Sequence, residues 1–398
     1  MRSARSICVW LHRWTGLFMA LFLIVAGLTG SVLVFSEELD EWLNPELYSV
    51  EPRQQMLTPD EIIAVVEKLA PSGSANLLLD LQRRPEKAAV VFVNPAAGSS
   101  PGFDQVFVDQ YAGRVLGTRL RAENTLDRAH VVPILLRVHN AILLPDPWGR
   151  WLMGSVALLW TANCFVGVYL TLPNRVRRFF ATWKNAWRIR RTWSIRPLSY
   201  DVHRASGLWV WAMLLVLALS SVQFNLGSEV FGPALTTVLP YHDPWDSVPK
   251  SAATRYESGL SWNQALAQGR KLMRDRARSG GFEINDESTL SLNRAAGVFV
   301  YTVRSSLDIR DRFGDTRILF SAANGRELGY THPRITSGNA FSSWLSALHT
   351  GRVWGWPFRM VIFLMGIVTV VLSAAGVLIW YLKRNTRPSV KAQPVMSR

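Results

Sequence analysis

The chain has 398 residues, 49% of them hydrophobic, and a formal net charge of +15. A chain this long and this apolar does not fit one ordinary soluble domain, so the composition favours a membrane protein. The positive charge would suggest a nucleic-acid-binding protein only if the basic residues covered a soluble surface, and their positions in the sequence argue against that.

Four stretches without a charged side chain or a histidine are each long enough to cross a hydrocarbon core about 30 Å thick. They are Trp14 to Phe35, Trp151 to Leu172, Ala205 to Ser228 and Met360 to Leu382. Aromatic or basic residues stand near an end of each stretch, where they are typical of the membrane interface. The first stretch lacks a clear signal-peptide cleavage site before Glu37. We therefore predict four transmembrane helices.

Basic residues gather in three segments that flank these spans. The N-terminal tail contains Arg2, Arg5 and Arg13, the segment 173–200 has eight basic residues and no acidic one, and the tail after Leu382 has five basic residues and no acidic one. The rest of the chain holds 28 basic and 29 acidic residues. Because short, positively charged segments stay in the cytoplasm, we predict that both termini and the 173–200 loop are cytoplasmic. Nucleic acid is not an expected partner.

The sequence contains an internal repeat. The motif H-R-x-x-G-L opens the first span at His12 to Leu17 and the third at His203 to Leu208. Each of these helices is followed by a region of more than a hundred residues, then by a histidine, His139 or His349, and then by the next span. Both halves run from inside to outside and back, which predicts two parallel repeats related by an axis along the membrane normal.

The two regions outside the membrane also resemble each other. Each is predicted to begin with a helix that has a capping box at its start, followed by strands and a final hairpin. The capping boxes are Thr58 to Glu61 and Ser261 to Gln264, the strands include Ala88 to Asn94 and Val298 to Arg304, and the hairpins turn at Ala112-Gly113 and Asn324-Gly325. The sequence thus predicts two small α+β domains.

Four histidines stand at corresponding points of the repeat. His12 and His203 lie at the cytoplasmic ends of their helices, and His139 and His349 lie near the external ends. The repeat pairs His12 with His203 and His139 with His349, each pair at one level of the membrane. Two neutral imidazoles from facing helices are the axial ligands of a six-coordinate b-type haem. We therefore predict two haems b, with these four histidines as the ligands of the haem iron.

Other interpretations of these residues stay open. A zinc or copper site is the main rival, although such sites usually add carboxylate or thiolate ligands, and none accompanies the histidines inside the spans. Arg13 and Arg204 directly follow the inner pair, and each either binds haem propionates or anchors the chain at the cytoplasmic interface. Arg352 and Arg359 allow the same two interpretations at the outer pair.

The repeated module, with its final hairpin of the form V-F-V-D-x-x-x-G-R-V-L-G at Val106 to Gly117, resembles the PepSY domain. From His12 to about Leu382 the chain resembles the PepSY-associated transmembrane-helix family of bacterial inner-membrane proteins, which includes haem-containing siderophore reductases. The resemblance implies periplasmic PepSY-like domains, haem ligation at the four histidines, and a ferric siderophore as substrate. It does not identify catalytic residues.

The expected protein is an integral membrane protein, mainly α-helical, that passes electrons across the bacterial inner membrane to periplasmic ferric iron. The sequence contains no G-x-G-x-x-G motif for binding a dinucleotide. We therefore expect electrons from quinol or from a donor protein. The alternatives are a non-enzymatic PepSY protein that binds or regulates a periplasmic partner, and a haem or metal transporter. The predicted boundaries are 1–36, 131–172, 201–228 and 339–382 for the transmembrane segments, the second and fourth with an interfacial helix; 37–130 and 229–338 for the periplasmic domains; and 173–200 and 383–398 for the cytoplasmic loop and tail.

Overall fold

The computed structural model describes residues 4–69, 76–94, 102–174, 178–249 and 259–385. The chain divides into two compact units. The first, here called the helical unit, comprises Met1–Ser31, His139–Asn225 and Phe363–Arg398, and the second, the sheet unit, comprises Val32–Val138 and Leu226–Ile362. The predicted cytoplasmic positions Arg2, Arg175 and Arg177, and the tail beyond Asn385, lie outside the described residues.

Long apolar helices supply most of the helical unit. They are α1 (Ala4–Leu33), α6 (Trp148–Thr171), α8 (Ile195–Trp209), α9 (Trp211–Asn225) and α13 (Gly355–Arg384). In the described chain α1, α6 and α13 are each long and apolar enough to cross a membrane, and α8 with α9 makes a fourth candidate span that is bent by 74°. The described residues therefore contain three candidate membrane-spanning helices, or four when the bent pair counts as one span.

The bend divides the stretch predicted as the third span. Val210, with φ −110° and ψ 11°, leaves the helical conformation between α8 and α9. Ser206 and Gly207 lie directly upstream, and Gly/Ser pairs are common at helix kinks because they leave the backbone weakly constrained. Helix α8 also begins earlier than expected, at Ile195, and two short helices precede it in the basic segment: α7 (Phe179–Trp183) and η2 (Lys184–Trp187).

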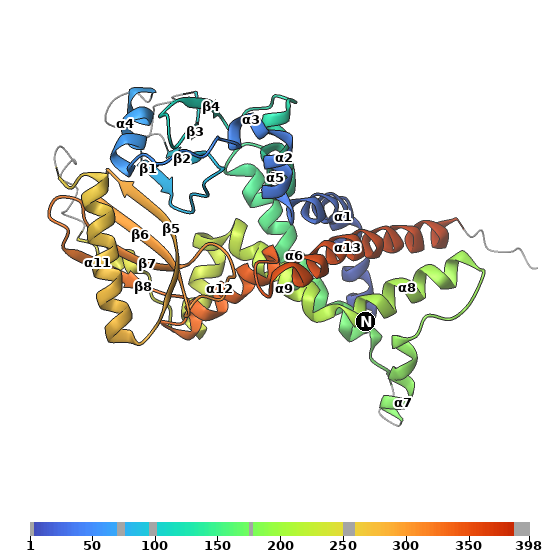
Figure 1. The fold of residues 1–398 in the computed structure, drawn as a ribbon. Coiled ribbons are helices and arrows are strands. Elements are labelled where there is room, and N and C mark those ends of the chain that lie inside the picture. The colour runs from blue at the N-terminus through green and yellow to red at the C-terminus, as the bar shows by residue number, and fades with distance from the viewer. Residues whose placement is uncertain (1–3, 70–75, 95–101, 175–177, 250–258, 386–398) are drawn as a thin grey trace, which may run out of the picture. The chain divides into compact units, whose positions relative to one another are not determined.

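An eight-stranded antiparallel sheet forms the centre of the sheet unit (Figure 1). Its strands in spatial order are β4 (Val115–Arg119), β3 (Gln105–Val108), β2 (Ala89–Asn94), β1 (Asn76–Asp80), β5 (Ile284–Asn293), β6 (Val298–Ser305), β7 (Thr316–Ser321) and β8 (Glu327–Thr331). The first four strands form one module and the last four another, and β1 pairs with β5 to join them. The two hairpins turn where the sequence predicts, between β3 and β4 and between β7 and β8.

Each module begins with one amphipathic helix, α4 (Pro59–Leu69) or α11 (Trp262–Gly280). Both start with the predicted capping box, since Glu61 accepts from the Thr58 amide and Gln264 from the Ser261 amide. The two helix starts also cap each other, because Asn263 Oδ1 accepts from the Asp60 amide and Asp60 Oδ1 accepts from the Asn263 amide, both at 3.2 Å. These exchanges satisfy amides that a helix start otherwise leaves without partners.

Both helices pack on the same apolar core. Leu77, Leu79, Leu290 and Leu292 of the central strands alternate with half-exposed residues and are almost fully buried. They form one cluster with buried residues of α4, such as Ile62, and with buried residues of α11. The period of two in the strands and the apolar stripe of each helix thus build one core for both modules.

Shorter helices complete the sheet unit. They are α2 (Ser36–Leu43), α3 (Pro45–Tyr48), η1 (Arg128–His130), α5 (Val131–Ala141, which continues into the helical unit), the π-helix η3 (Gly227–Phe231), α10 (Gly232–Val238), η4 (Pro244–Ser247) and α12 (Ser337–Thr350). Two of them pack closely on the edge strands: a Cβ on Gly117 of β4 would lie 2.4 Å from Leu47 of α3, and one on Gly329 of β8 would lie 2.6 Å from the Pro244 carbonyl of η4.

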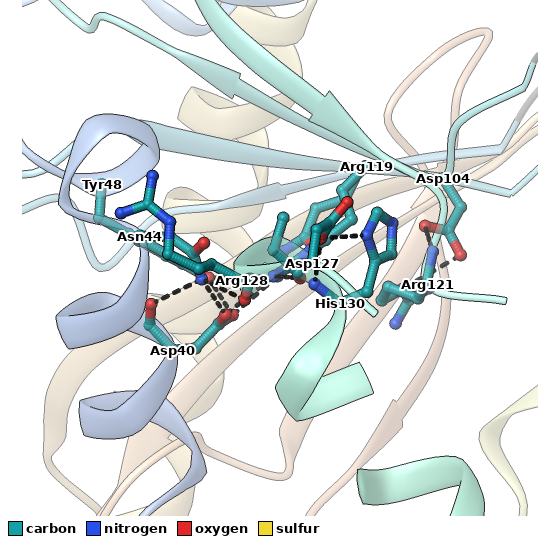
Figure 2. A network of polar contacts seen from close by, with 11 residues as sticks. Asp40, Asn44, Tyr48, Asp104, Arg119, Arg121, Asp127, Arg128 and His130 are labelled. Carbon is teal, nitrogen blue, oxygen red and sulfur yellow. Dashed lines mark hydrogen bonds and ion pairs between the residues drawn. The ribbon is translucent and has the colours of Figure 1, made fainter. Parts of the chain in front are cut away.

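A buried polar network ties α2 to the sheet and to the start of α5 (Figure 2). Arg119 of β4 pairs with both oxygens of Asp40, at 2.9 and 2.8 Å, and the two side chains are only 3% and 9% exposed. Arg119 also donates to the carbonyl of Ala129 in η1 at 2.8 Å. Asp127 caps η1 by accepting from the amide and from Nδ1 of His130. This network positions the first turn of α5, the helix that carries His139.

Candidate functional site

A cavity of about 710 Å³ lies inside the helical unit. Residues of α1, α6, α8, α9 and α13 line it, and most of its surface is apolar, with Leu17, Leu23, Trp160, Trp211 and Leu214 among the walls. Its basic lining residues come from the first half of α1, from α8 and from the last turn of α13: Arg5, Arg13, Arg204, Lys383 and Arg384. The cavity therefore suits a ligand with a large apolar body and acidic groups at one end.

His12 of α1 and His203 of α8 both line this cavity. Their ring centroids are 6.1 Å apart and their planes form an angle of 71°. The structure thus brings together the two histidines that the repeated motif pairs, although they are far apart in the sequence.

The Nδ1 atom of each ring is held by an acceptor on a neighbouring helix. His12 Nδ1 lies 2.8 Å from Oδ1 of Asn163 in α6, and His203 Nδ1 lies 2.9 Å from the Leu372 carbonyl in α13. Amide and carbonyl oxygens only accept hydrogen bonds, so Nδ1 carries the proton in both rings. A neutral imidazole in this tautomer has its lone pair on Nε2, which is the atom that then binds a metal ion.

A glycine stands four residues after each acceptor. A Cβ on Gly167, four residues after Asn163, would lie 3.3 Å from His12 Cε1, and one on Gly376, four residues after Leu372, would lie 3.4 Å from His203 Cε1. The missing side chain leaves room for the histidine ring against the helix. At Gly376, the missing side chain also leaves the Leu372 carbonyl accessible to the His203 ring.

The glycines of the two H-R-x-x-G-L motifs contribute to the same contacts. A Cβ on Gly16 would meet the Asn163 side chain at 3.8 Å, and one on Gly207 would meet the Leu372 side chain at 3.7 Å. Each motif therefore places a histidine and, one turn later, a glycine against the residue that holds that histidine. The two halves of the chain use the same arrangement, α1 against α6 and α8 against α13.

His139 of α5 is also held at Nδ1 by an acceptor on another helix. Its Nδ1 lies 3.0 Å from the Ala26 carbonyl and 3.1 Å from the Thr29 hydroxyl of α1. That hydroxyl donates to Val25, so it accepts from the histidine. A Cβ on Gly30, four residues after Ala26, would lie 2.9 Å from His139 Cε1. All three histidines of the helical unit are thus held at Nδ1 beside a glycine.

His349 lies in α12 of the sheet unit, in the last turn before the left-handed Gly351. It belongs to a different unit from His139. The pairing of these two histidines therefore stays a prediction from the repeat.

The two arginines predicted beside the inner pair differ in their surroundings. Arg13 lines the cavity. Arg204 also lines it, but its guanidinium pairs with the buried Asp201 at 2.9 Å and donates to the carbonyls of Asn185 and Ala186. Arg204 thus holds the η2 segment in place, and Arg13 is the better candidate for an acidic group of a ligand.

The arginines near the outer histidine make ion pairs within the sheet unit. Arg352 pairs with Glu37 at 2.6 Å and Arg359 with Glu38 at 2.6 Å. Burial lowers the pKa of Arg352, and Glu37 opposes that effect. Both side chains thus have protein partners.

Sequence reasoning missed Asn163, Asp201 and the glycines opposite the rings. A signal for Asn163 was present, since a side-chain amide within an apolar span is costly and therefore a candidate for function. Asp201 was also visible as a lone acid directly after the basic segment. The residues that hold the inner histidines therefore combine one polar side chain, one backbone carbonyl and small residues, whereas Asp201 pairs with Arg204.

The helical unit and its cavity define a polytopic membrane protein with a ligand site between its helices. The profile of the PepSY-associated TM region matches residues 9–383. The chain belongs to this family, as the sequence motifs predict. A search of curated proteins returns no match.

Proposed function

We propose that the protein is a haem-dependent reductase of the bacterial inner membrane that passes electrons to the ferric iron of a periplasmic siderophore. One shared hydrogen bond carries this proposal. In His12, His203 and His139 alike, Nδ1 is held by an acceptor on a neighbouring helix. Metal-binding histidines are typically held in this way, because the second hydrogen bond sets both the tautomer and the ring direction.

The dimensions of the inner site fit a haem. Metal–imidazole bonds of about 2.0–2.1 Å would let two rings whose centroids lie about 6 Å apart hold one metal ion between them. The centroids of His12 and His203 are 6.1 Å apart. The cavity of about 710 Å³ falls within the range of about 300–1,000 Å³ that holds cofactors. Arg13, Lys383 and Arg384 also line the cavity and would suit the two carboxylates of a haem.

The residues also favour haem over a bare metal ion. Zinc and copper sites usually take three or four protein ligands. Within the described residues no group of three or more His, Cys, Asp or Glu side chains is placed to hold a metal ion. Two imidazoles are enough for haem, since the porphyrin supplies the other four nitrogens.

We propose a second haem between His139 and His349, which the repeat places at the other membrane level. In this arrangement the two halves are parallel repeats, the termini and the 173–200 loop are cytoplasmic, and the domains 37–130 and 229–338 are periplasmic. The positive charge of the cytoplasmic segments supports this orientation.

When bound, each haem takes up and gives away one electron at a time. The histidines would hold the haem iron through Nε2, the apolar walls would exclude water, and the basic lining residues would balance the propionates. Ferric siderophore iron is the substrate, and its reduction weakens the bonds to the hard oxygen ligands and so releases it. Quinol or a donor protein supplies the electrons.

The test is an absorption spectrum of the detergent-purified protein, oxidised and then reduced with dithionite, with haem counted per chain. We expect two low-spin b haems, and the loss of one in both His12→Ala and His203→Ala. His332→Ala is the control, because His332 belongs to the sheet unit and is not among the residues that line the cavity. A colourless protein from haem-supplied cells would contradict the proposal and favour a PepSY protein that binds a partner.

A further inference from the structure

A second cavity, of about 480 Å³, adjoins the histidine cavity in the helical unit. The two share five lining residues, Arg5, Leu170, Thr171, Tyr200 and Arg204. The second cavity continues from there to η2 and α7, whose residues Thr182, Asn185 and Ala186 also line it. A ligand bound here would lie directly beside the group that His12 and His203 hold.

The lining of this second cavity combines apolar and uncharged polar groups. The apolar side comes from Leu170, Leu172, Pro173 and Ala186, and the polar side from Thr171, Asn174, Thr182, Asn185 and Tyr200. Hydroxyls and side-chain amides can both donate and accept hydrogen bonds. Such a wall suits a small ring that carries hydroxyl or carbonyl oxygens.

The charged side chains in the wall of the second cavity already have hydrogen-bond partners within the protein. Arg5 donates to the Leu170 and Leu172 carbonyls at 2.7 and 3.1 Å. Arg204 donates to backbone carbonyls of η2 and pairs with Asp201. Asp201 is also paired with Arg190. An anionic ligand would have to compete with these bonds, so the cavity favours a neutral ligand.

The segment over the second cavity has the composition of a membrane-surface element. Phe180 is 78% exposed, and Trp187 and the basic Lys184 are also exposed. Trp183 of the same segment donates through Nε1 to the Thr171 hydroxyl at 3.2 Å, which ties the segment to the end of α6. Aromatic and basic residues together are typical of the headgroup level, where a lipid-soluble ligand arrives from the bilayer.

We infer that this second cavity binds the headgroup of a lipid-soluble quinol, which is the electron donor; the inference rests on the proposed haem function. A quinol would give up its two electrons one at a time to a haem held by His12 and His203. The first electron has to move on to the ferric acceptor before the haem can take the second, and the quinol then leaves as the quinone. Its two protons pass to water at the open mouth of the cavity.

The test compares two alanines of the same segment. Ala186 lines the cavity and is buried, whereas Ala181 of α7 is exposed and is not a lining residue. Haem reduction by decylubiquinol is followed by absorbance in the purified full-length protein. We expect Ala186→Phe to slow it by about tenfold or more, which corresponds to about 1.4 kcal/mol or more of lost interaction. Ala181→Phe keeps the wild-type rate, and dithionite reduces all three proteins alike.

A second variant covers the case in which Ala186→Phe does not fold. Asn185→Leu replaces a polar lining group by an apolar one with the same number of side-chain heavy atoms, and we expect it to raise the quinol concentration needed for half-maximal haem reduction. Equilibrium dialysis with decylubiquinone gives a reading that does not depend on haem, with weaker binding to both lining variants than to Ala181→Phe. Equal quinone binding and equal rates in all variants would overturn the inference alone. Haem that dithionite reduces but quinol does not would also overturn it, whereas a wild-type protein without haem overturns the proposed function as well.

Discussion

The contact between Gly30 and His139 predicts a sharp difference between two glycine-to-alanine changes in α1. A Cβ on Gly30 would lie 2.9 Å from His139 Cε1, closer than carbon atoms normally approach. A Cβ on Gly16 of the same helix would have its nearest neighbour at 3.8 Å, an ordinary contact. The two substitutions are chemically identical and differ in the space available.

The expected magnitudes follow from two opposing effects. Alanine stabilises a helix interior by about 0.8–1.0 kcal/mol relative to glycine. An extra group in a packed site costs about 1–3 kcal/mol because neighbours must shift. Gly16→Ala therefore leaves the free energy of unfolding unchanged or raises it by up to about 1 kcal/mol. Gly30→Ala lowers it by up to about 2 kcal/mol and moves the His139 ring away from the Ala26 carbonyl.

Thermal denaturation in detergent measures the stability of both variants, and under the proposed function the haem spectrum also reports the position of His139. We expect Gly30→Ala to unfold at a lower temperature than Gly16→Ala and to change the spectrum of one haem only. Equal stability of the two variants with unchanged spectra would refute the reasoning, because His139 would then not pack against Gly30.

Three further predictions concern the sheet unit. Arg119→Leu leaves Asp40 buried without its partner and lowers the free energy of unfolding by about 3–5 kcal/mol, measured by thermal denaturation, whereas the double change to leucine at both positions costs less. Burial alone would raise the pKa of Glu287, but the hydrogen bonds from Arg270 lower it below its usual value. The ionised Glu287 thus stabilises the fold above about pH 4.3 and this stability is lost as the pH falls further, so Glu287→Gln flattens the acid side of the stability–pH curve. Burial raises the pKa of Asp80, so its ionised form opposes folding at neutral pH, and Asp80→Asn raises the melting temperature at pH 7 but not near pH 3.

Local signals in the sequence predict much of the sheet unit. The capping boxes at Thr58 and Ser261 and the turn at Asn324-Gly325 depend on neighbouring residues, and the structure confirms all three. The pairing of β1 with β5 depends on residues more than 200 positions apart, such as Leu77 opposite Leu292. Two short apolar strands do not reveal their partner, so the single eight-stranded sheet was not predictable from local pattern.

The helical unit shows the same limit. Charge-free stretches predict where the apolar helices lie, and the repeated motif predicts that His12 and His203 meet. The 74° bend follows the Ser206-Gly207 pair, but no proline marks it in the sequence, and the sequence analysis did not predict it. The glycines opposite the histidine rings become meaningful only when the helices are in contact, because Gly167 and Gly376 are distant in sequence from the rings that they accommodate.

The proposed function depends on electron transfer across the membrane from haem to siderophore iron. The most direct measurement uses vesicles that contain the purified protein, with dithionite trapped inside and a ferric siderophore and a coloured ferrous chelator outside. We predict that the chelator takes up ferrous iron at a rate that depends on the protein, and that His12→Ala abolishes it. Haem that becomes reduced without any appearance of ferrous iron, across a range of siderophores, would contradict a reductase function.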